Sequence, residues 1–263
     1  MPDDLARARR WNQRTDPRSA VRTAVVWDAL DPLVDERARV LGRPLVVVDV
    51  GGGTGGFAVP LAELGHRVTV VDPSPDALAA LARRAAEADV ADRVRPVQGD
   101  AGSLVPLVGA GSADLVLCHG ALEFVDHPGA AVHDAVEVLA PGGLLSLLVA
   151  QRLGAVLARA LSGRFLDARR LLDDPAGRAG DRDPVPRRFD RAGLLALLAG
   201  HPVEVRAVHG VRLFSDLLPG SLVDGDPEAA AALLELERTA GDHTTHPELT
   251  AVAAQLHLVA QRR

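Results

Sequence analysis

The chain alternates between short β-branched runs and longer stretches in which apolar residues recur at helical spacing. Predicted strands lie at residues 45–50, 67–72, 94–100, 114–119 and 144–149. Predicted helices lie between them, at residues 57–64, 76–88 and 130–139. Strands that alternate with helices imply an α/β fold with a mostly parallel sheet and helices on both faces.

The flanking segments extend this pattern. Residues 19–41 predict a helix with one buried face and a break at Pro32. Residues 151–190 are rich in arginine and predict an inserted substrate-side segment, a helix followed by a loop. The remaining predictions are helices at 191–198 and 228–239 and strands at 203–210 and 256–260. Because no internal repeat is evident, we expect a single domain over residues 1–263, with residues 1–43 as an N-terminal helical lid.

A glycine cluster separates the first predicted strand from the helix after it. Five of six consecutive residues are glycine: Gly51, Gly52, Gly53, Gly55 and Gly56. Residues 51, 53 and 56 satisfy the Gly-x-Gly-x-x-Gly spacing, which lets a nucleotide-like ligand approach bare backbone at a helix N-terminus. A tight turn without a ligand is the alternative, but it needs fewer glycines.

Acidic residues stand at the carboxyl ends of three predicted strands. Asp49 would repel a dinucleotide pyrophosphate, but it suits a ligand that carries an ammonium group and a sulfonium. Asp72 suits hydrogen bonds to ribose hydroxyls in either class of cofactor. Asp100 is suited to accept from an adenine amino group, or to cap a turn. One cationic ligand that contains adenosine, such as S-adenosylmethionine, explains all three.

Composition narrows the chemistry. The chain is 48% hydrophobic and 24% charged, which excludes a disordered or collagenous protein. One cysteine, Cys118, excludes a disulfide framework and a zinc site built from cysteines. The absence of lysine excludes a lysine Schiff base and a P-loop lysine. We expect no metal site, no membrane span and a cytoplasmic location.

The charge of the chain neither clearly favours nor clearly opposes binding to nucleic acid. The net charge of -6 provides no global attraction to it. Arginines are nevertheless concentrated in two segments. Residues 1–22 contain six arginines and three acidic residues, and residues 151–191 contain ten arginines and six acidic residues. A local basic face would explain these clusters, but such runs more often form an ordinary solvated surface.

Several motifs resemble class I S-adenosylmethionine-dependent methyltransferases. They are Val-Val-Asp-Val-Gly-Gly-Gly-Thr-Gly at 47–55, Val-Val-Asp at 70–72, Gly-Asp-Ala at 99–101 and Leu-Ala-Pro-Gly-Gly at 139–143. The last of these also reads as a simple turn into a strand, since Pro141 and Gly142 suit a type II turn. The resemblance implies a Rossmann-like sheet and S-adenosylmethionine as cofactor.

Further matches resemble the bacterial tRNA 5-carboxymethoxyuridine methyltransferase family, which esterifies a carboxylate on the wobble base. They are the segments 22–31, 118–125, 182–184, 210–216 and 233–237. The resemblance implies that Arg22 covers the cofactor carboxylate and that Gly51 and Gly52 contact the cofactor through their backbone. It further implies that Asp72 holds the ribose and that Asp100 and Ala101 flank adenine. His119 would sit by the methionine end.

A carboxylate acceptor is already ionised at neutral pH, so its methylation needs alignment rather than a base. Arg212 or Arg182 would orient such an acceptor. A phenol or alcohol acceptor would instead need a base, and His119 or His133 could serve. The candidate catalytic residues are thus His119 and Arg212, and the candidate acceptor is tRNA or a small carboxylate or hydroxyl compound. A small-molecule O-methyltransferase and a non-catalytic S-adenosylmethionine-binding module remain the alternatives.

Overall fold

The structure is a computed structural model that describes residues 17–219, 222–223 and 225–263, with side chains from Thr23 onward. The chain divides into two compact units, which are considered separately. The sheet unit comprises Pro32–Val149, Ala192–Ala207 and Leu258–Arg263. The second unit comprises the residues up to Asp31, Ala150–Arg191 and Val208–His257. The prediction of a single domain with a lid at 1–43 stays a prediction.

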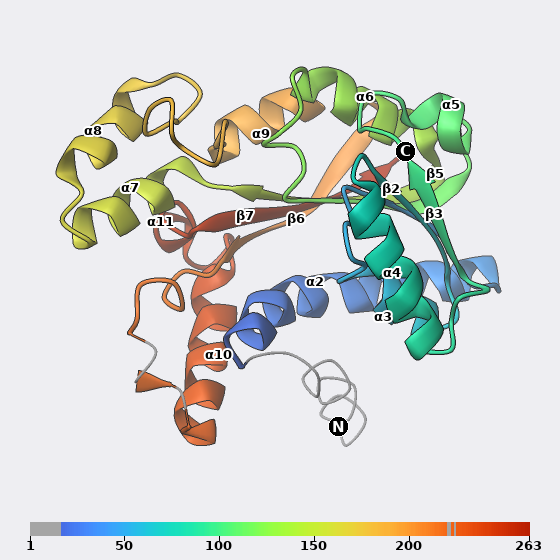
Figure 1. The fold of residues 1–263 in the computed structure, drawn as a ribbon, viewed down its shortest axis with the longest axis horizontal. Helices are drawn as coiled ribbons and strands as arrows, with labels where there is room; N and C mark the ends of the chain where they lie inside the picture. Colours follow the sequence, from blue (N-terminus) through green and yellow to red (C-terminus); the bar gives the residue numbers. More distant parts are fainter. Residues whose placement is uncertain (1–16, 220–221, 224) are drawn as a thin grey trace. The chain divides into compact units, whose positions relative to one another are not determined.

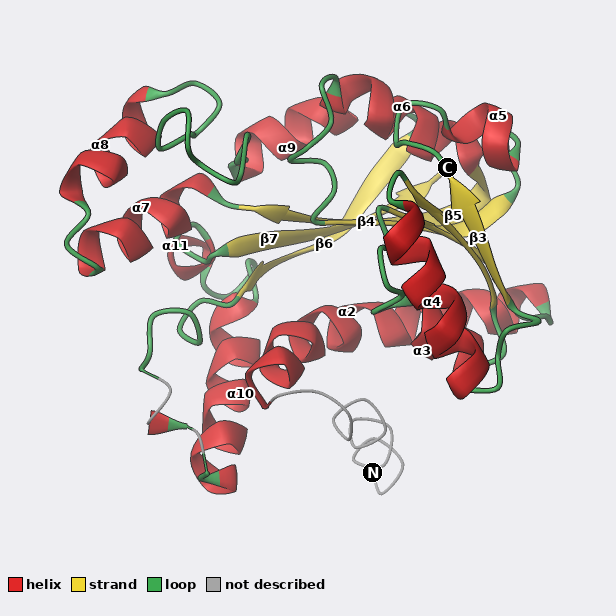
Figure 2. Cartoon of the chain, in the orientation of Figure 1, coloured by secondary structure: helices red, strands yellow, loops and turns green. Residues whose placement is uncertain are grey.

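Seven strands form one mostly parallel sheet in the order β3-β2-β1-β4-β5-β7-β6 (Figures 1 and 2). The strands are β1 Val46–Val50, β2 Arg67–Asp72, β3 Val94–Gln98, β4 Ala113–His119, β5 Leu139–Ala150, β6 Val203–Val211 and β7 Gln255–Arg262. The pairings of β1 with β2 and β4, of β2 with β3 and of β4 with β5 are parallel. The predicted α/β fold with a mostly parallel, Rossmann-like sheet is confirmed.

Helices connect these strands. In the sheet unit they are α3 Ala58–Glu63, α4 Pro75–Glu87, α5 Leu104–Val108 and α6 Pro128–Val138. In the second unit they are α7 Arg152–Leu161, α8 Phe165–Asp173, α10 Pro227–Gly241 and α11 Pro247–Thr250. Helix α2 Pro17–Leu41 and helix α9 Arg191–Leu198 contribute residues to both units.

Local sequence explains where α4 begins. The Ser74 hydroxyl accepts a hydrogen bond from the Ala77 N–H at 3.2 Å, and Pro75 occupies the first turn. The hydroxyl satisfies an N–H that has no partner within the helix, and proline has no N–H to satisfy there. The burial of Leu78, Leu81 and Ala85 then fixes the face of α4 that packs inward.

Two predictions about helices need correction. Helix α2 continues through Pro32, where a break was expected. Its apolar face, which includes the buried Leu30 and Val34, continues across the proline, and this burial outweighs the loss of one backbone hydrogen bond. Segment 151–190 contains two helices, α7 and α8, rather than one before its loop.

The fifth strand begins earlier than predicted. Strand β5 starts at Leu139, opposite Ala113, and the pairing with β4 resumes only at Leu144, opposite Leu115. The extra residues form a bulge in which Gly142 has φ +73, a left-handed conformation that glycine adopts without strain. The turn expected at residues 141–143 is therefore present, but it lies within the strand.

Candidate functional site

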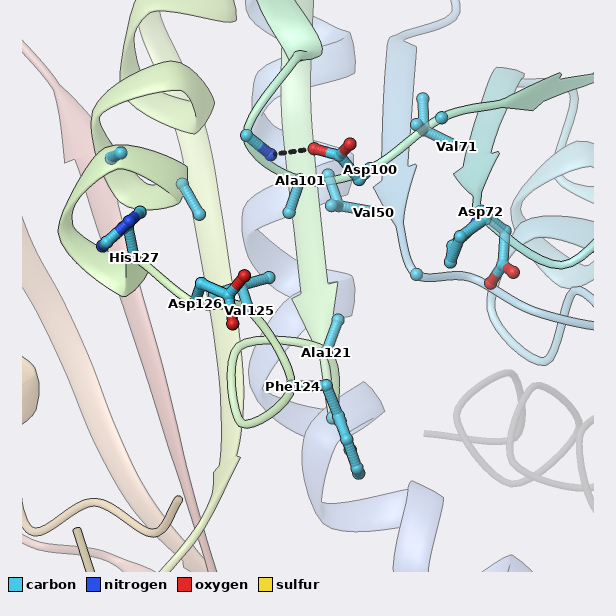
Figure 3. A pocket seen from close by; sticks show the side chains of 17 residues that line it. Val50, Val71, Asp72, Asp100, Ala101, Ala121, Phe124, Val125, Asp126 and His127 are labelled. Carbon is cyan, nitrogen blue, oxygen red and sulfur yellow. Dashed lines mark hydrogen bonds between the residues drawn. The ribbon is translucent and has the colours of Figure 1, made fainter. Parts of the chain in front are cut away.

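A cavity of about 620 Å³ lies in the sheet unit, at the carboxyl ends of β1, β2, β3 and β4 (Figure 3). In an open α/β sheet this edge is where ligands bind. A volume of this size lies within the ~300–1,000 Å³ range of small-molecule sites. The wall includes four residues predicted to bind the cofactor: Gly51, Asp72, Asp100 and Ala101.

The glycine loop leaves β1 in a conformation that a larger residue would not allow. Gly51 has φ +68, and its N–H donates to the Val71 carbonyl at 2.8 Å. A Cβ at Gly51 would overlap the Ala121 side chain, and one at Gly52 would overlap the carboxyl group of Asp49. Bare backbone therefore lies against the site, as the motif predicts.

Asp72 connects the glycine loop to the end of β2. One of its carboxylate oxygens accepts from the Gly53 N–H and the other from the Ser74 N–H, each at 2.9 Å. A carboxylate has about four lone-pair sites, so each oxygen can accept a further hydrogen bond. The backbone thus holds Asp72 on the cavity wall with acceptor capacity left for two hydroxyl groups of a ligand.

Asp49 is the most unusual charge near the loop. Its side chain is 2% exposed, and it makes no hydrogen bond or ion pair with any described residue. Burial, together with the nearby Asp72 charge, raises the pKa of Asp49 to about 7. An adjacent cation would reverse this shift by stabilising the ionised carboxylate. The residue lies behind Gly52 and is not among the residues that line the cavity.

The remaining predicted cofactor residues take different places. Asp100 forms a turn in which its carboxylate accepts from the Gly102 N–H at 2.8 Å, and it also lines the cavity (Figure 3). Both interpretations of Asp100 from the sequence, a turn cap and a ligand contact, are therefore compatible. Gly52, Gly53 and Gly55 lie outside the cavity lining.

Sequence reasoning missed one side of the cavity. The segment after β4 lines it with Phe124, Val125, Asp126 and His127 (Figure 3). Phe124 is 60% exposed and lies on the cavity wall, so its ring is available to contact a ligand. The signal available in the sequence was position, since these residues follow a strand at the edge where ligands bind.

His119 ends β4 but is not among the residues that line the cavity. Its Nε2 lies 2.7 Å from the Ser146 hydroxyl, and its ring meets the Phe57 ring edge-on at a centroid distance of 4.5 Å. Burial lowers the pKa of His119 to about 3. The imidazole is therefore neutral at physiological pH and a weak base. Its catalytic and cofactor-binding roles stay predictions.

Arg212 belongs to the second unit. Its guanidinium forms an ion pair with Asp216, and its backbone has φ +61. The turn that follows is held by the buried Glu237, which accepts from the N–H groups of Leu213, Phe214 and Ser215 at 2.7–2.9 Å. These hydrogen bonds link segment 233–237 to segment 210–216, two segments that both resemble the tRNA methyltransferase family. The role of Arg212 toward an acceptor stays a prediction.

The predicted contact from Arg22 lies outside the described side chains, although its backbone belongs to α2. His133 is exposed on α6, where its ring lies 5.5 Å from that of His201. The exposed Arg182 lies in the loop after α8. Neither His133 nor Arg182 is among the described residues that line the cavity.

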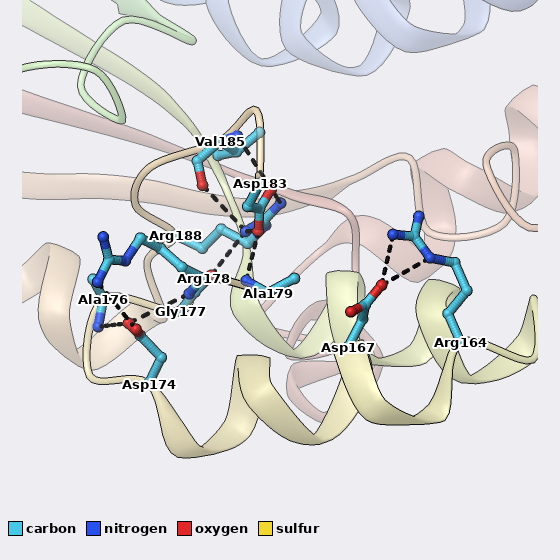
Figure 4. A network of polar contacts seen from close by, with 10 residues as sticks. All are labelled: Arg164, Asp167, Asp174, Ala176, Gly177, Arg178, Ala179, Asp183, Val185 and Arg188. Carbon is cyan, nitrogen blue, oxygen red and sulfur yellow. Dashed lines mark hydrogen bonds and ion pairs between the residues drawn. The ribbon is translucent and has the colours of Figure 1, made fainter. Parts of the chain in front are cut away.

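Acids neutralise much of the arginine cluster at 151–191 locally (Figure 4). Within the second unit, ion pairs join Arg152 to Asp190, Arg164 and Arg170 to Asp167, Arg169 to Asp173, Arg178 to Asp174, and Arg188 to Asp183. A guanidinium that already holds a carboxylate is less available to a phosphate. The arginine content of this segment alone therefore does not make it a basic face.

Two absences in the described part of the chain bear on its chemistry. In that part of the chain, no group of three or more histidine, cysteine or acidic side chains is arranged to hold a metal ion. The described helices include none that is long and apolar enough to cross a membrane.

Comparison with known proteins agrees with this geometry. Residues 48–147 match the family described as "Methyltransferase domain". The chain is 30% identical over 236 residues to the tRNA 5-carboxymethoxyuridine methyltransferase of Escherichia coli K12, covering 89% of this chain and 87% of that protein. It is 32% identical over 177 residues to the ubiquinone biosynthesis O-methyltransferase of Caulobacter sp. K31, covering 67% of this chain and 66% of that protein.

Among solved structures, magnesium protoporphyrin IX methyltransferase from Synechocystis PCC 6803 with bound SAH has the same fold. The TM-score is 0.58 at 16% identity, with 99% of this chain and 95% of that chain covered. The cavity, the glycine loop and the acids at 49, 72 and 100 suit S-adenosylmethionine, a cation with a ribose and an adenine. The chain belongs to the class I S-adenosylmethionine-dependent methyltransferases, in the family that includes the tRNA 5-carboxymethoxyuridine methyltransferases.

Proposed function

We propose that this enzyme transfers a methyl group to a carboxylate oxygen and forms a methyl ester, with 5-carboxymethoxyuridine at the tRNA wobble position as the acceptor. The observation that carries the proposal is the extent of similarity to the E. coli tRNA enzyme, which reaches 89% of this chain. It therefore extends well beyond the methyltransferase domain matched at residues 48–147. Segments such as 210–216, which resemble the same family and which a shared cofactor site does not require, agree with this extent.

The residues around the cavity suit an acceptor that is already ionised. Bound S-adenosylmethionine supplies an activated methyl group on a positively charged sulfur. Asp72 would hold the ribose hydroxyls, and the Gly51 backbone would allow close approach. A carboxylate acceptor needs only to be aligned, which is worth roughly 7–11 kcal/mol in well-oriented systems. The pKa of about 3 for His119 makes that side chain a poor proton acceptor at neutral pH, and this favours an acceptor with no proton to lose.

A small hydroxyl compound is the second candidate, because the Caulobacter relative is named for O-methylation in ubiquinone biosynthesis. Such an acceptor would require a base. His133, the remaining candidate for this role, lies exposed on α6 and is not among the residues that line the cavity.

The decisive experiment combines tRNA from a deletion strain with the purified enzyme and labelled S-adenosylmethionine. We expect a labelled methyl ester in the digested nucleosides, which mild alkali releases as methanol. An Asp72→Asn variant is the control, and it should lose transfer because the cofactor site is impaired. Transfer to catechol or phenol compounds, with none to tRNA, would support the second candidate and contradict the first.

A further inference from the structure

A second hollow, of about 610 Å³, lies in the sheet unit at the amino ends of β1, β2 and β3. This is the end of the strands opposite to the cofactor cavity. Its wall includes Pro44, Val46, Arg67, Thr69, Arg93 and Arg95. No sequence motif pointed to this place, and the proposed methyl transfer does not use it.

Strand register places the hollow on one face of the sheet. Val46 pairs with Arg67, and Thr69 pairs with Arg95. Side chains two residues apart on a strand share a face, and so do paired residues of neighbouring strands. Arg67, Thr69 and Arg95 therefore point to the same side. Sheet faces in α/β proteins are ordinarily apolar and covered by helices, whereas here both arginines are exposed.

These guanidinium groups differ from those in segment 151–191. The guanidinium groups of Arg67 and Arg95 make no hydrogen bond or ion pair with any described residue. Arg93 donates to the Ala62 carbonyl at 3.2 Å and lies 3.9 Å from the carboxylate of Asp92. Asp92 is the one acid in the wall, and its side chain is 75% exposed. The hollow therefore carries a net positive charge that the described part of the protein leaves uncompensated.

We propose that this hollow is a binding site for the phosphate groups of an anionic ligand. A guanidinium binds phosphate oxygens through two parallel N–H bonds, which suits it to this role. Arg67 and Arg95 would supply the direct contacts, with Arg93 at the edge and the Thr69 hydroxyl as a further donor. The phosphate can belong to a tRNA backbone or to a small phosphorylated compound.

The test uses inorganic pyrophosphate as the probe and the complete protein. Calorimetric titration compares the wild type, the double variant Arg67→Ala/Arg95→Ala and the control Arg83→Ala. Arg83 is an exposed arginine of α4 that makes no ion pair in the described chain and lies outside the hollow. We expect the double variant to bind pyrophosphate about tenfold more weakly or worse, and the control to bind normally. The Arg95→Lys variant keeps the charge but loses the paired N–H donors of the guanidinium. Its affinity for pyrophosphate should lie between those of the wild type and the double variant.

A parallel measurement of tRNA binding at several salt concentrations identifies the source of the phosphate. If the phosphate belongs to tRNA, the double variant should bind tRNA more weakly. The slope of the log binding constant against the log salt concentration should also decrease in magnitude by about one to two, because phosphate contacts are lost. If tRNA binding is unchanged while pyrophosphate binding is lost, a small phosphorylated compound is the ligand. Unaltered S-adenosylmethionine affinity in every variant shows that folding is intact.

The proposal is wrong if the double variant binds pyrophosphate as the wild type does. It is also wrong if the wild type neither takes up pyrophosphate nor loses tRNA affinity on substitution. Neither result depends on the methyl acceptor, because the assays measure binding without transfer.

Discussion

Asp49 is a buried acid whose ionisation affects stability and, by prediction, cofactor binding. Its pKa of about 7 in the folded chain lies above the ordinary value of 3.8, because burial and the Asp72 charge disfavour ionisation. The folded state therefore holds this proton more tightly than the unfolded state does. The resulting stabilisation is complete below about pH 4 and is lost as the pH rises through about 7.

Replacing Asp49 by asparagine should separate these two effects. Without cofactor, Asp49→Asn should raise the free energy of unfolding at pH 8 by on the order of a few kcal/mol, since one pKa unit corresponds to about 1.4 kcal/mol. The predicted contact of Asp49 with the positive charge of S-adenosylmethionine implies that the affinity for this cofactor should fall, because the substitution removes the negative charge. Urea denaturation at pH 5 and pH 8, together with calorimetry, measures both. Equal stability of the two proteins at pH 8 would contradict the assigned burial cost.

Glu237 is a structural carboxylate of a different kind. It is fully buried and serves three backbone N–H groups at the turn after Arg212. Glu237→Ala would leave these donors without acceptors, at about 1–3 kcal/mol for each buried unsatisfied group. We expect a loss of roughly 3 kcal/mol or more in the free energy of unfolding. Glu235→Ala, at an exposed position of the same helix, is the matched control and should change stability little.

At the scale of elements, the loop after α8 depends on one buried ion pair. Arg188 and Asp183 are joined at 2.6 Å, and their side chains are almost inaccessible (Figure 4). Burial alone would raise the pKa of Asp183, but hydrogen bonds from Arg188 and from the backbone of Ala179 and Val185 lower it to about 2. The stabilisation that this carboxylate provides is therefore present above about pH 4 and is lost as the pH falls through about 2.

Removing one partner of this pair should cost far more than disrupting an exposed one. Arg188→Ala should destabilise the protein by about 3–5 kcal/mol, because it leaves a buried charge uncompensated. Arg164→Ala, which breaks the exposed pair with Asp167, should cost about 1 kcal/mol or less. Chemical denaturation of the two variants side by side tests this contrast. Similar losses would show that the loop does not depend on the buried pair.

At the scale of the whole molecule, the division into two units makes a prediction about cooperativity. The cavity is built from the sheet unit. At a concentration of about 100 times its dissociation constant, S-adenosylmethionine should raise the free energy of unfolding of the sheet unit by about 2.7 kcal/mol. Any part of the chain that unfolds cooperatively with the sheet unit should share this stabilisation. If the units unfold together, one calorimetric transition should rise by roughly 5–10 °C. If they unfold separately, only one of two transitions should move.

The sequence by itself determined the alternation of strands with most of the helices along the chain, the glycine loop and the acids at positions 49, 72 and 100. These are local patterns, because period, turn chemistry and strand ends are encoded in neighbouring residues. Only the tertiary structure decided that α2 continues through Pro32, since burial of a helix face involves distant partners. It also decided which arginines meet an acid and which, such as Arg67 and Arg95, do not. Charge can be counted along a chain, but pairing depends on which residues the fold brings together.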